Sequence, residues 1–151
     1  AAAGINRPDS GKRTAPSAKN WQDVAVYVAM ADGLYLYNAK THSLDPVLKA
    51  DLRGETTHFL QPSRSSIEAA PLQLIYVADY SKMTIATSAE NKLLYSGADS
   101  AFIAQNVYLY CASEGLATGI RAMLDKTGLA KDMKLRDQQK VVFAQAVGYP
   151  E

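Results

Sequence analysis

A buried strand followed by a tight turn constrains the fold of this chain more than any other feature. Residues 24–31, Val-Ala-Val-Tyr-Val-Ala-Met-Ala, are almost wholly apolar and predict a strand in the interior. Asp32-Gly33 is a strong hairpin signal, and residues 34–37 form the expected return strand. Residues 44–48 predict a short third strand, which Pro46 confines to an edge of the sheet. The first sheet is therefore antiparallel.

The rest of the chain adds strands and helices to this hairpin. Residues 72–78 and 141–147 predict two further strands. Shorter elements are expected as helices around 50–53, 65–69 and 122–131, a helical segment within 81–95, and the end of a helix at Ala1–Ala3 with Gly4 as its C-cap. The 151 residues suffice for one domain with a core. We expect an α+β domain, an antiparallel or mixed sheet flanked by long helices.

Residues 99–113 predict the main helix, which Asp99 or Ser100 caps and Gly115 ends. Apolar residues surround nearly its whole circumference, so it must be buried on several sides. Two arrangements satisfy this requirement. Either the helix packs on the sheet with one side and on a partner subunit with another, or it lies wholly inside one subunit.

The composition excludes several classes of function. A net charge of +1 argues against a general binder of nucleic acid or acidic membranes, and no apolar run reaches the roughly 18 residues of a membrane span. Cys111 is the only cysteine, and His42 and His58 lack ligand-like spacing, so no metal site is expected. No Gly-x-Gly-x-x-Gly, Walker or Gly-x-Ser-x-Gly motif is present. We interpret carboxylates such as Glu90 and Asp99 as solvated surface residues.

The loop before the first strand has the chemistry of a cofactor-binding segment. Small residues in it let backbone N–H groups approach an anion or a flat ring, while Ser17, Asn20 and Gln22 can donate hydrogen bonds. Lys12 and Arg13 bring positive charge. A loop of this kind can hold a phosphorylated aromatic cofactor. The alternative is an ordinary Gly/Pro/Ser loop, which is common before strands.

Arg13-Thr-Ala-Pro-Ser-Ala18 followed by Val24-Ala-Val-Tyr-Val28 resembles the nitroreductase family of FMN-dependent enzymes. It is most similar to the branch that includes the azoline oxidases of peptide heterocycle biosynthesis. Further pieces follow in the same order over most of the chain: Gly33-Leu-Tyr-Leu-Tyr37, His42-Ser-Leu44, Ala104-Gln-Asn-Val-Tyr-Leu109, Glu114-Gly-Leu-Ala-Thr-Gly119 and Val147-Gly-Tyr-Pro150. The order and spacing of these pieces carry the resemblance.

The resemblance implies a nitroreductase-like fold and a homodimer with two FMN sites at the subunit interface. It implies an FMN-dependent oxidoreductase that passes hydride from NAD(P)H through the flavin to an electron-poor acceptor such as a nitroaromatic or quinone. Catalysis then needs no catalytic side chain, because the flavin carries the chemistry. One alternative is an azoline-type flavin dehydrogenase, against which Trp21 and Gln22 count because they replace a Tyr-Pro element. The other is a non-catalytic, flavin-free fragment of the fold.

The resemblance also implies which residues contact the cofactor. Pro16, Ser17 and Ala18 match the segment that lies against the flavin from the partner subunit, and Asn20 matches an Asn that bonds the ring or the ribityl chain. Gly119-Ile-Arg-Ala122 falls at a turn where a backbone N–H, here that of Arg121 or Ala122, points at flavin N5. The expected cofactor-binding residues are Arg13, Pro16, Ser17, Ala18, Asn20, Gln22, Gly119, Arg121 and Ala122.

The chain departs from the family at its phosphate contacts. Family members hold the FMN phosphate with an N-terminal Arg-x-Ser-x-Arg segment and with a Lys or Arg after the final Gly-Tyr-Pro; here the first is absent and Glu151 takes the second place. Each such contact is worth roughly 1.5–3 kcal/mol, so FMN affinity is expected to fall, with Lys12 and Arg13 compensating in part. We expect a single domain over residues 1–151 whose N-terminal part is missing, and a cytoplasmic location is favoured over export.

Overall fold

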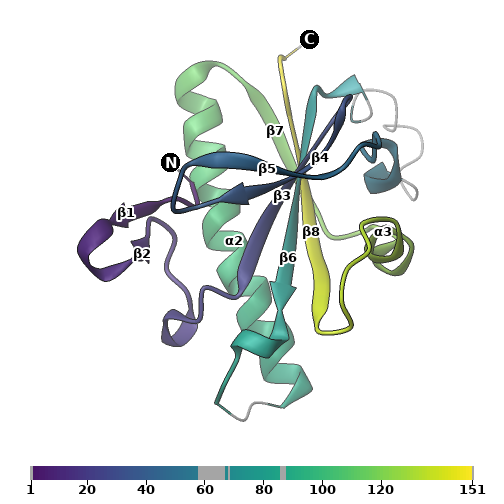
Figure 1. Ribbon diagram of the computed structural model, residues 1–151. Helices are drawn as coiled ribbons and strands as arrows, with labels where there is room; N and C mark the ends of the chain where they lie inside the picture. Colours follow the sequence, from purple (N-terminus) through teal and green to yellow (C-terminus); the bar gives the residue numbers. More distant parts are fainter. Residues whose placement is uncertain (1, 58–66, 68, 86–87, 151) are drawn as a thin grey trace.

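A computed structural model describes residues 2–57, 67, 69–85 and 88–150 of the protein. Its centre is a six-stranded sheet in the order β5-β4-β3-β6-β8-β7, and all five neighbouring pairs are antiparallel (Figure 1). The strands are β3 (Val24–Met30), β4 (Gly33–Asn38), β5 (Ser43–Leu48), β6 (Leu72–Asp79), β7 (Ala117–Arg121) and β8 (Gln139–Gly148). Two short strands, β1 (Ile5–Arg7) and β2 (Lys12–Arg13), pair separately.

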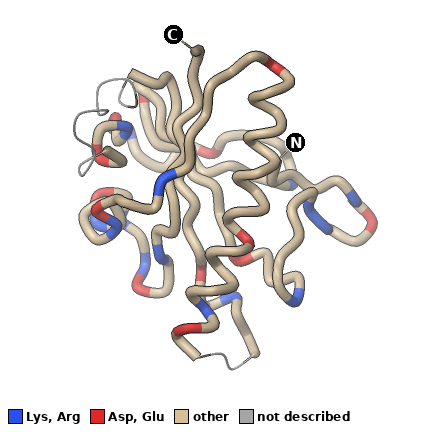
Figure 2. The backbone as a smooth tube through the Cα atoms, turned by 180° about the vertical axis from the view of Figure 1, so that it is seen from behind, with Lys and Arg blue, Asp and Glu red and all other residues tan. Residues whose placement is uncertain are grey.

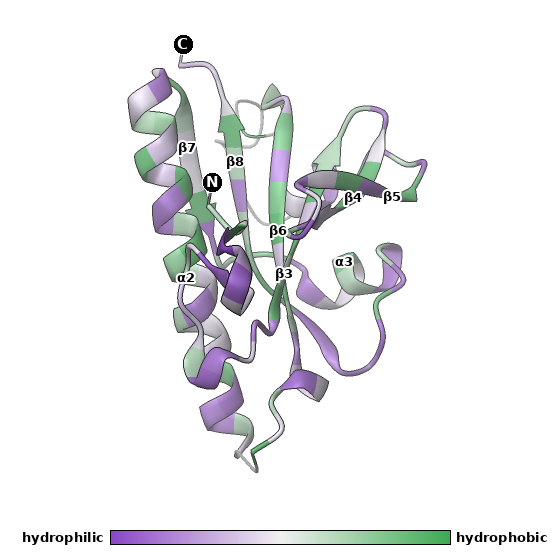
Figure 3. Cartoon of the chain, turned by 60° about the vertical axis from the view of Figure 1, so that its left-hand side comes forward, coloured by the Kyte–Doolittle hydropathy of each residue, from purple (hydrophilic) through white to green (hydrophobic). Residues whose placement is uncertain are grey.

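Of the two α-helices that the described residues complete, one covers each face of the sheet. The long helix α2 (Ala89–Glu114, 26 residues) lies along one face and the short helix α3 (Lys126–Asp132, seven residues) lies on the other (Figure 3). Four 3-10 turns complete the described elements: Pro8–Ser10, Ala18–Asn20, Gly54–Thr57 and Tyr80–Lys82. The α+β prediction is confirmed. Within the described residues, no helix combines the length and the apolar character that a membrane crossing requires.

The expected hairpin is confirmed, with its turn displaced by one residue. Met30 pairs with Gly33, so the turn residues are Ala31 and Asp32 and Gly33 already belongs to β4. The glycine is needed for a different reason: a Cβ at this position would lie 2.7 Å from the Leu48 carbonyl oxygen in β5. β5 is an edge strand, as Pro46 predicted.

The main helix begins ten residues earlier than expected. Ser88 caps α2 by accepting a hydrogen bond from the Asn91 N–H (3.2 Å), whereas Asp99 and Ser100 lie buried in the middle of the helix. The prediction that one of them caps the helix is therefore wrong. Gly115 does end the helix, with φ of 67°.

Several smaller predictions are corrected. Residues 50–53 are not helical, and the nearest 3-10 turn is Gly54–Thr57. The segment 122–131 becomes helical only at Lys126, where the Asp125 carboxylate accepts the Gly128 N–H (2.9 Å). Ala2–Ala3 is not helical. Within 81–95 the α-helix starts at residue 89, while residues 86–87, Ala1 and most of 65–69 fall outside the described residues.

The two faces of α2 differ. Ile103, Ala104, Val107 and Cys111 are buried against the sheet. Leu94, Phe102 and Leu109 on the other side are between 47% and 64% exposed. Within the part of the chain that the structure describes, this side of α2 is therefore uncovered. The fully buried Gln145 fixes α2 to the sheet, since it accepts a hydrogen bond from the Tyr76 hydroxyl and donates to the Ala104 carbonyl.

Candidate functional site

The loop 13–22 has an unusual backbone conformation. Lys19, Asn20 and Gln22 have φ of 51°, 56° and 48°, and they are three of the five non-glycine residues with positive φ among the described residues. This left-handed region is tolerated by Asn but strained for Lys and Gln. Such strain persists only where surrounding contacts over-determine the backbone, and it is concentrated at functional sites.

Hydrogen bonds within the loop account for part of this restraint. The Ser17 hydroxyl accepts the Gln22 N–H (3.0 Å), and the Ser17 carbonyl accepts the Asn20 N–H (3.0 Å). The Gln22 side-chain amide donates to the Gly11 carbonyl (2.8 Å). Gln22 is therefore engaged in shaping the loop. The Ser17 hydroxyl keeps its own proton available to a ligand.

The loop is also anchored on α2. The Ala18 N–H donates to both carboxylate oxygens of Asp99, at 3.2 and 3.0 Å. The Trp21 ring meets the Tyr95 ring edge-on, with 5.8 Å between centroids. On its other side, the Lys82 ammonium donates to the Gln22 carbonyl (3.1 Å). These contacts set the loop at the middle of the long helix.

The loop surrounds a small hollow rich in cations and donors. The hollow has a volume of about 240 Å³ and is lined by Arg7, Lys12, Arg13, Thr14, Ala15, Pro16, Ser17 and Asn20. Arg7, Lys12 and Asn20 are exposed there. Figure 2 shows Lys and Arg on the β1–β2 segment beside α2. The hollow suits an anionic or hydrogen-bond-accepting ligand.

Arg13 points inward, unlike its exposed neighbour Lys12. Its Nη1 donates to the Val24 carbonyl (3.1 Å), and its Nε is buried without a partner among the described residues. Burial lowers the pKa of Arg13, and the nearby Tyr37 and Asp23 act in the opposite direction. Its guanidinium is thus held inside the protein, so the exposed Lys12 is the better placed of the two predicted cations.

Gly119, Arg121 and Ala122 lie in or directly after β7. The Arg121 side chain turns to the α3 face of the sheet, where Nη2 donates to Thr56 Oγ1 (3.0 Å) and Gln73 Oε1 (2.8 Å). Burial lowers the pKa of Arg121. Its guanidinium is therefore held away from the loop, and only its backbone remains a candidate for the predicted role.

The direction of the backbone amides distinguishes Arg121 from Ala122. The Ile120 N–H points away from β8 and donates to the Tyr108 hydroxyl (2.9 Å). Amides alternate along a strand, so the Arg121 N–H faces β8, where Arg121 pairs with Ala144. The next outward amide is that of Ala122, which is exposed. A Cβ at Gly119 would have no neighbour within 4 Å, so this edge is open.

The two predicted groups do not meet within one chain. The loop contacts α2 at Asp99, whereas β7 contacts it at Tyr108, nine residues later. This separation is about 13 Å along the helix axis. Figure 1 shows the N-terminal loop beside the lower half of α2 and β7 beside its upper half.

Two carboxylates of the site were missed from the sequence. Asp23 is 0% exposed and Asp99 is 3% exposed, so the interpretation of Asp99 as a surface residue was wrong, although Glu90 is exposed as expected. Burial, followed by the hydrogen bond with Asp23, raises the pKa of Asp99 to about 7. The available signal was position: Asp99 precedes the buried Ile103 by one helical turn, and Asp23 directly precedes the buried strand.

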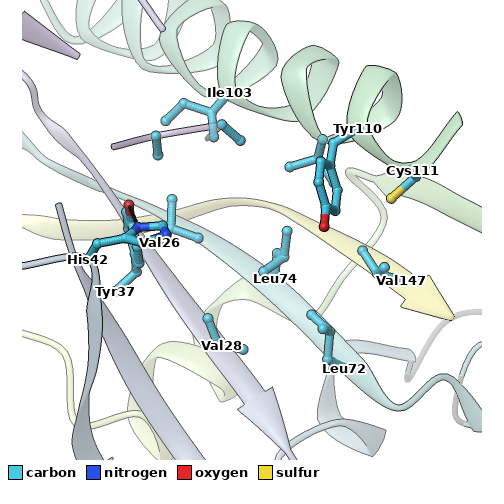
Figure 4. A pocket seen from close by; sticks show the side chains of 13 residues that line it. Val26, Val28, Tyr37, His42, Leu72, Leu74, Ile103, Tyr110, Cys111 and Val147 are labelled. Atoms are coloured by element: carbon cyan, nitrogen blue, oxygen red, sulfur yellow. Dashed lines mark hydrogen bonds between the residues drawn. The ribbon is translucent and has the colours of Figure 1, made fainter. Parts of the chain in front are cut away.

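An apolar hollow of about 490 Å³ lies between α2 and the sheet (Figure 4). Val26, Leu74 and Ile103 are among its mostly apolar lining residues, and the Tyr110 hydroxyl points into it. Tyr37 and His42 also line it, and the Tyr37 hydroxyl and His42 Nδ1 are 2.8 Å apart. It carries little polar chemistry, so the loop hollow is the stronger candidate for a polar cofactor.

Comparisons with known proteins agree with these observations. The family model described as "Nitroreductase family" matches residues 1–149. The curated "Putative nitroreductase MJ1384" of Methanocaldococcus jannaschii is 30% identical over 116 residues, which are 73% of this chain and 58% of the relative. The chain therefore spans little more than half the length of that relative.

Solved structures share the fold. A structure described as a "putative nitroreductase" of Ralstonia eutropha is 36% identical, with a TM-score of 0.89 over 99% of this chain and 69% of that one. The Escherichia coli microcin synthetase McbBCD complex matches at 17% identity and a TM-score of 0.84, over 99% and 60%. The Vibrio harveyi NADPH:FMN oxidoreductase matches at 19% and 0.69, over 91% and 55%. The last two show the fold alone.

Proposed function

The chain belongs to the nitroreductase family, and we propose that it is an FMN-dependent oxidoreductase. In this proposal it transfers hydride from NAD(P)H through the flavin to an electron-poor acceptor such as a nitroaromatic or a quinone. The observation that carries the proposal is the donor-rich hollow of loop 13–22, set against a helix whose outer face is uncharged and apolar. Such a hollow is half of a site that an interface completes.

The outer face of α2 supports a homodimer. Asp99 is the one charged residue between positions 93 and 113, and it is buried. The large exposed apolar residues of this face include Leu94, Phe102 and Leu109. Soluble monomers rarely expose a large contiguous apolar surface. A second copy covers this face in our proposal, and it brings β7 of one chain toward loop 13–22 of the other.

The residues of the loop fit a flavin. Ser17 has a hydroxyl proton to donate, and the exposed Asn20 amide nitrogen makes no hydrogen bond within the described residues. These two groups would bond the ring or the ribityl chain, while Pro16 and Ala18 would lie against the ring. Arg7 and Lys12 offer charge for a phosphate.

The second chain would supply the groups near the reacting atom. The outward Ala122 N–H is the backbone donor that would face flavin N5, and the open edge at Gly119 leaves room for the ring. The flavin itself supplies the hydride chemistry when bound. The protein binds it, orients it and leaves one face to substrates. The Vibrio harveyi neighbour, named as an NADPH:FMN oxidoreductase, is a precedent for this pair of reactants on the same fold.

A visible absorbance spectrum tests the proposal. The purified protein is measured before and after incubation with excess FMN and desalting, and then after addition of NADH or NADPH. Bands near roughly 370 and 450 nm that survive desalting and are bleached by a nicotinamide are expected. The variant Asn20→Leu should retain less flavin, and Gln138→Leu, altered at an exposed position before β8, should retain as much as the wild type. A protein that stays colourless with FMN contradicts the proposal and favours a flavin-free fragment of the fold.

An azoline-type flavin dehydrogenase is the second candidate, favoured by the TM-score of 0.84 to the microcin synthetase complex. In this alternative the substrate, rather than a nicotinamide, reduces the flavin. The same experiment separates the two functions. Flavin that is bound but not bleached by NADH or NADPH would support the dehydrogenase.

A further inference from the structure

A pair of buried carboxylates lies beneath loop 13–22 and has no role in the function proposed above. Asp23 and Asp99 are 0% and 3% exposed. Among the described residues, no N–H or hydroxyl group donates to either carboxylate oxygen of Asp23, and the neighbouring Ser100 hydroxyl has no partner. Asp99 accepts one backbone donor, the Ala18 N–H. Buried carboxylates without donors are rare in proteins, so this pair calls for a physical explanation.

The charged groups around the pair do not neutralise two negative charges. Arg13 is the nearby cation, and its guanidinium is already bonded to the Val24 carbonyl. Tyr37, from β4, also acts electrostatically on Arg13. Along α2, the residues from 93 to 113 contain no second charge. Two ionised carboxylates facing each other here would repel one another without compensation.

A single proton bound between the two carboxylates removes this repulsion. A carboxyl O–H on one aspartate can donate to the carboxylate of the other, which supplies the missing donor. The protonated pair carries a single negative charge, which Arg13 faces. The Ala18 N–H still has an acceptor in Asp99, so the loop stays attached to α2.

We propose that Asp23 and Asp99 share one proton and together form a clamp that positions loop 13–22, closing when the proton is bound and opening when it leaves. Both residues are positioning residues, because they act on the cofactor through Ala18 and the loop. The link to the cofactor rests on the proposed function. The clamp itself is a property of the chain alone.

The electrostatics set the direction of the response. Burial, and after it the hydrogen bond with Asp23, raises the pKa of Asp99 to about 7, while the Ala18 N–H acts the other way. The shared proton is therefore present below neutral pH and lost above it. Loss of the proton places two charges together under a strained backbone, and the loop is released from α2.

The chain contains its own probe of the loop. Trp21 is the only tryptophan, and its ring meets Tyr95 of α2. We would titrate its fluorescence in the flavin-free protein from about pH 5.5 to about pH 9. A transition with a midpoint near 7 is expected for the wild type. A flat wild-type titration would overturn the clamp.

Matched variants identify the titrating group. Asp99→Asn and Asp23→Asn each replace the shared O–H by an amide N–H, so both should hold the low-pH signal at every pH. Asp99→Asn also keeps an acceptor for Ala18. His42→Gln and His58→Gln remove the two histidines and should leave the transition unchanged. A transition that persists in both Asn variants, or disappears in a histidine variant, contradicts the clamp.

FMN titrations connect the clamp to the cofactor. If the closed loop is needed for binding, the wild-type dissociation constant should rise up to about tenfold per pH unit above the midpoint, and that of Asp99→Asn should not. FMN affinity that ignores pH while Trp21 responds would overturn the positioning role. A Trp21 transition without FMN binding at any pH would instead leave the clamp standing and refute the proposed function.

Discussion

Strand β3 and the loop that precedes it, residues 13–22, are joined directly in the chain but are stabilised in different ways. β3 lies between β4 and β6, and its buried side chains pack with those of both neighbours. The loop buries few apolar groups, adopts a strained backbone and depends on contacts to Asp99, Gly11 and Lys82. Burial makes the strand insensitive to its surroundings. Polar contacts leave the loop sensitive to protonation and ligands, which suits a binding segment.

The core should be the costliest place to alter. Ile75 in β6 is 0% exposed and belongs to the cluster on the α3 face. Replacing it with alanine should lower the free energy of unfolding by about 2–5 kcal/mol, because a cavity remains where the side chain was. Urea denaturation measures the loss. Leu44→Ala, altered at an exposed position of β5, should change it by less than about 0.5 kcal/mol. Similar losses in both variants would mean that the sheet core is not the main source of stability.

The outer face of α2 offers the next largest effect. Leu109 is 61% exposed in the single chain, and a lysine placed there would enter the proposed interface as an unpaired charge. Dimerisation should weaken by about 2 kcal/mol, or roughly thirtyfold. Sedimentation at falling protein concentration detects the change. Val47→Lys on the edge strand β5 is the control. Unchanged association of Leu109→Lys would remove α2 from the interface.

The same contrast explains how much of the structure could be predicted from the sequence. The hairpin and the edge position of β5 follow from local signals at Asp32-Gly33 and Pro46, and the structure confirms both. Local patterns suffice where each residue's preference agrees with its place in the fold. The family followed from short motifs whose order is retained along the chain.

The rest of the site depends on contacts between distant segments. Asp23 was not singled out and Asp99 was expected as a helix cap or a surface residue, and only the fold brings the two together. The segment of β7 was expected as a turn followed by a helix. It was missed as a strand because so short a segment becomes a strand only by pairing with β8. That pairing decides that the Arg121 side chain turns to the α3 face. No local pattern in the sequence contains this information.

A pH series sharpens the comparison between strand and loop. Burial raises the pKa of Asp99 above that of the unfolded chain, so the folded state binds more protons between the two values. The free energy of unfolding should therefore fall as pH rises from about 4 to about 7 and then level off. Asp99→Asn should lack this component and be more stable than the wild type above neutral pH, by about 1 kcal/mol. Urea denaturation at several pH values measures both. The prediction would be contradicted if the stability of the wild type, relative to that of Asp99→Asn, were lower at low pH than at high pH.

The smallest expected effect concerns the strain in the loop itself. Lys19 is exposed with φ of 51°, a conformation that glycine adopts without steric penalty. Lys19→Gly should raise the free energy of unfolding by up to about 1 kcal/mol, because the strain released exceeds the added entropy of the unfolded chain. Lys134→Gly, with φ of 54° near α3, should behave alike in urea denaturation. The two should differ at the loop: only Lys19→Gly should alter Trp21 fluorescence, since it removes a side chain that restricts the backbone beside the clamp. If Lys19→Gly is less stable than the wild type, the backbone there is not strained, and the contacts to α2 have no strain to oppose.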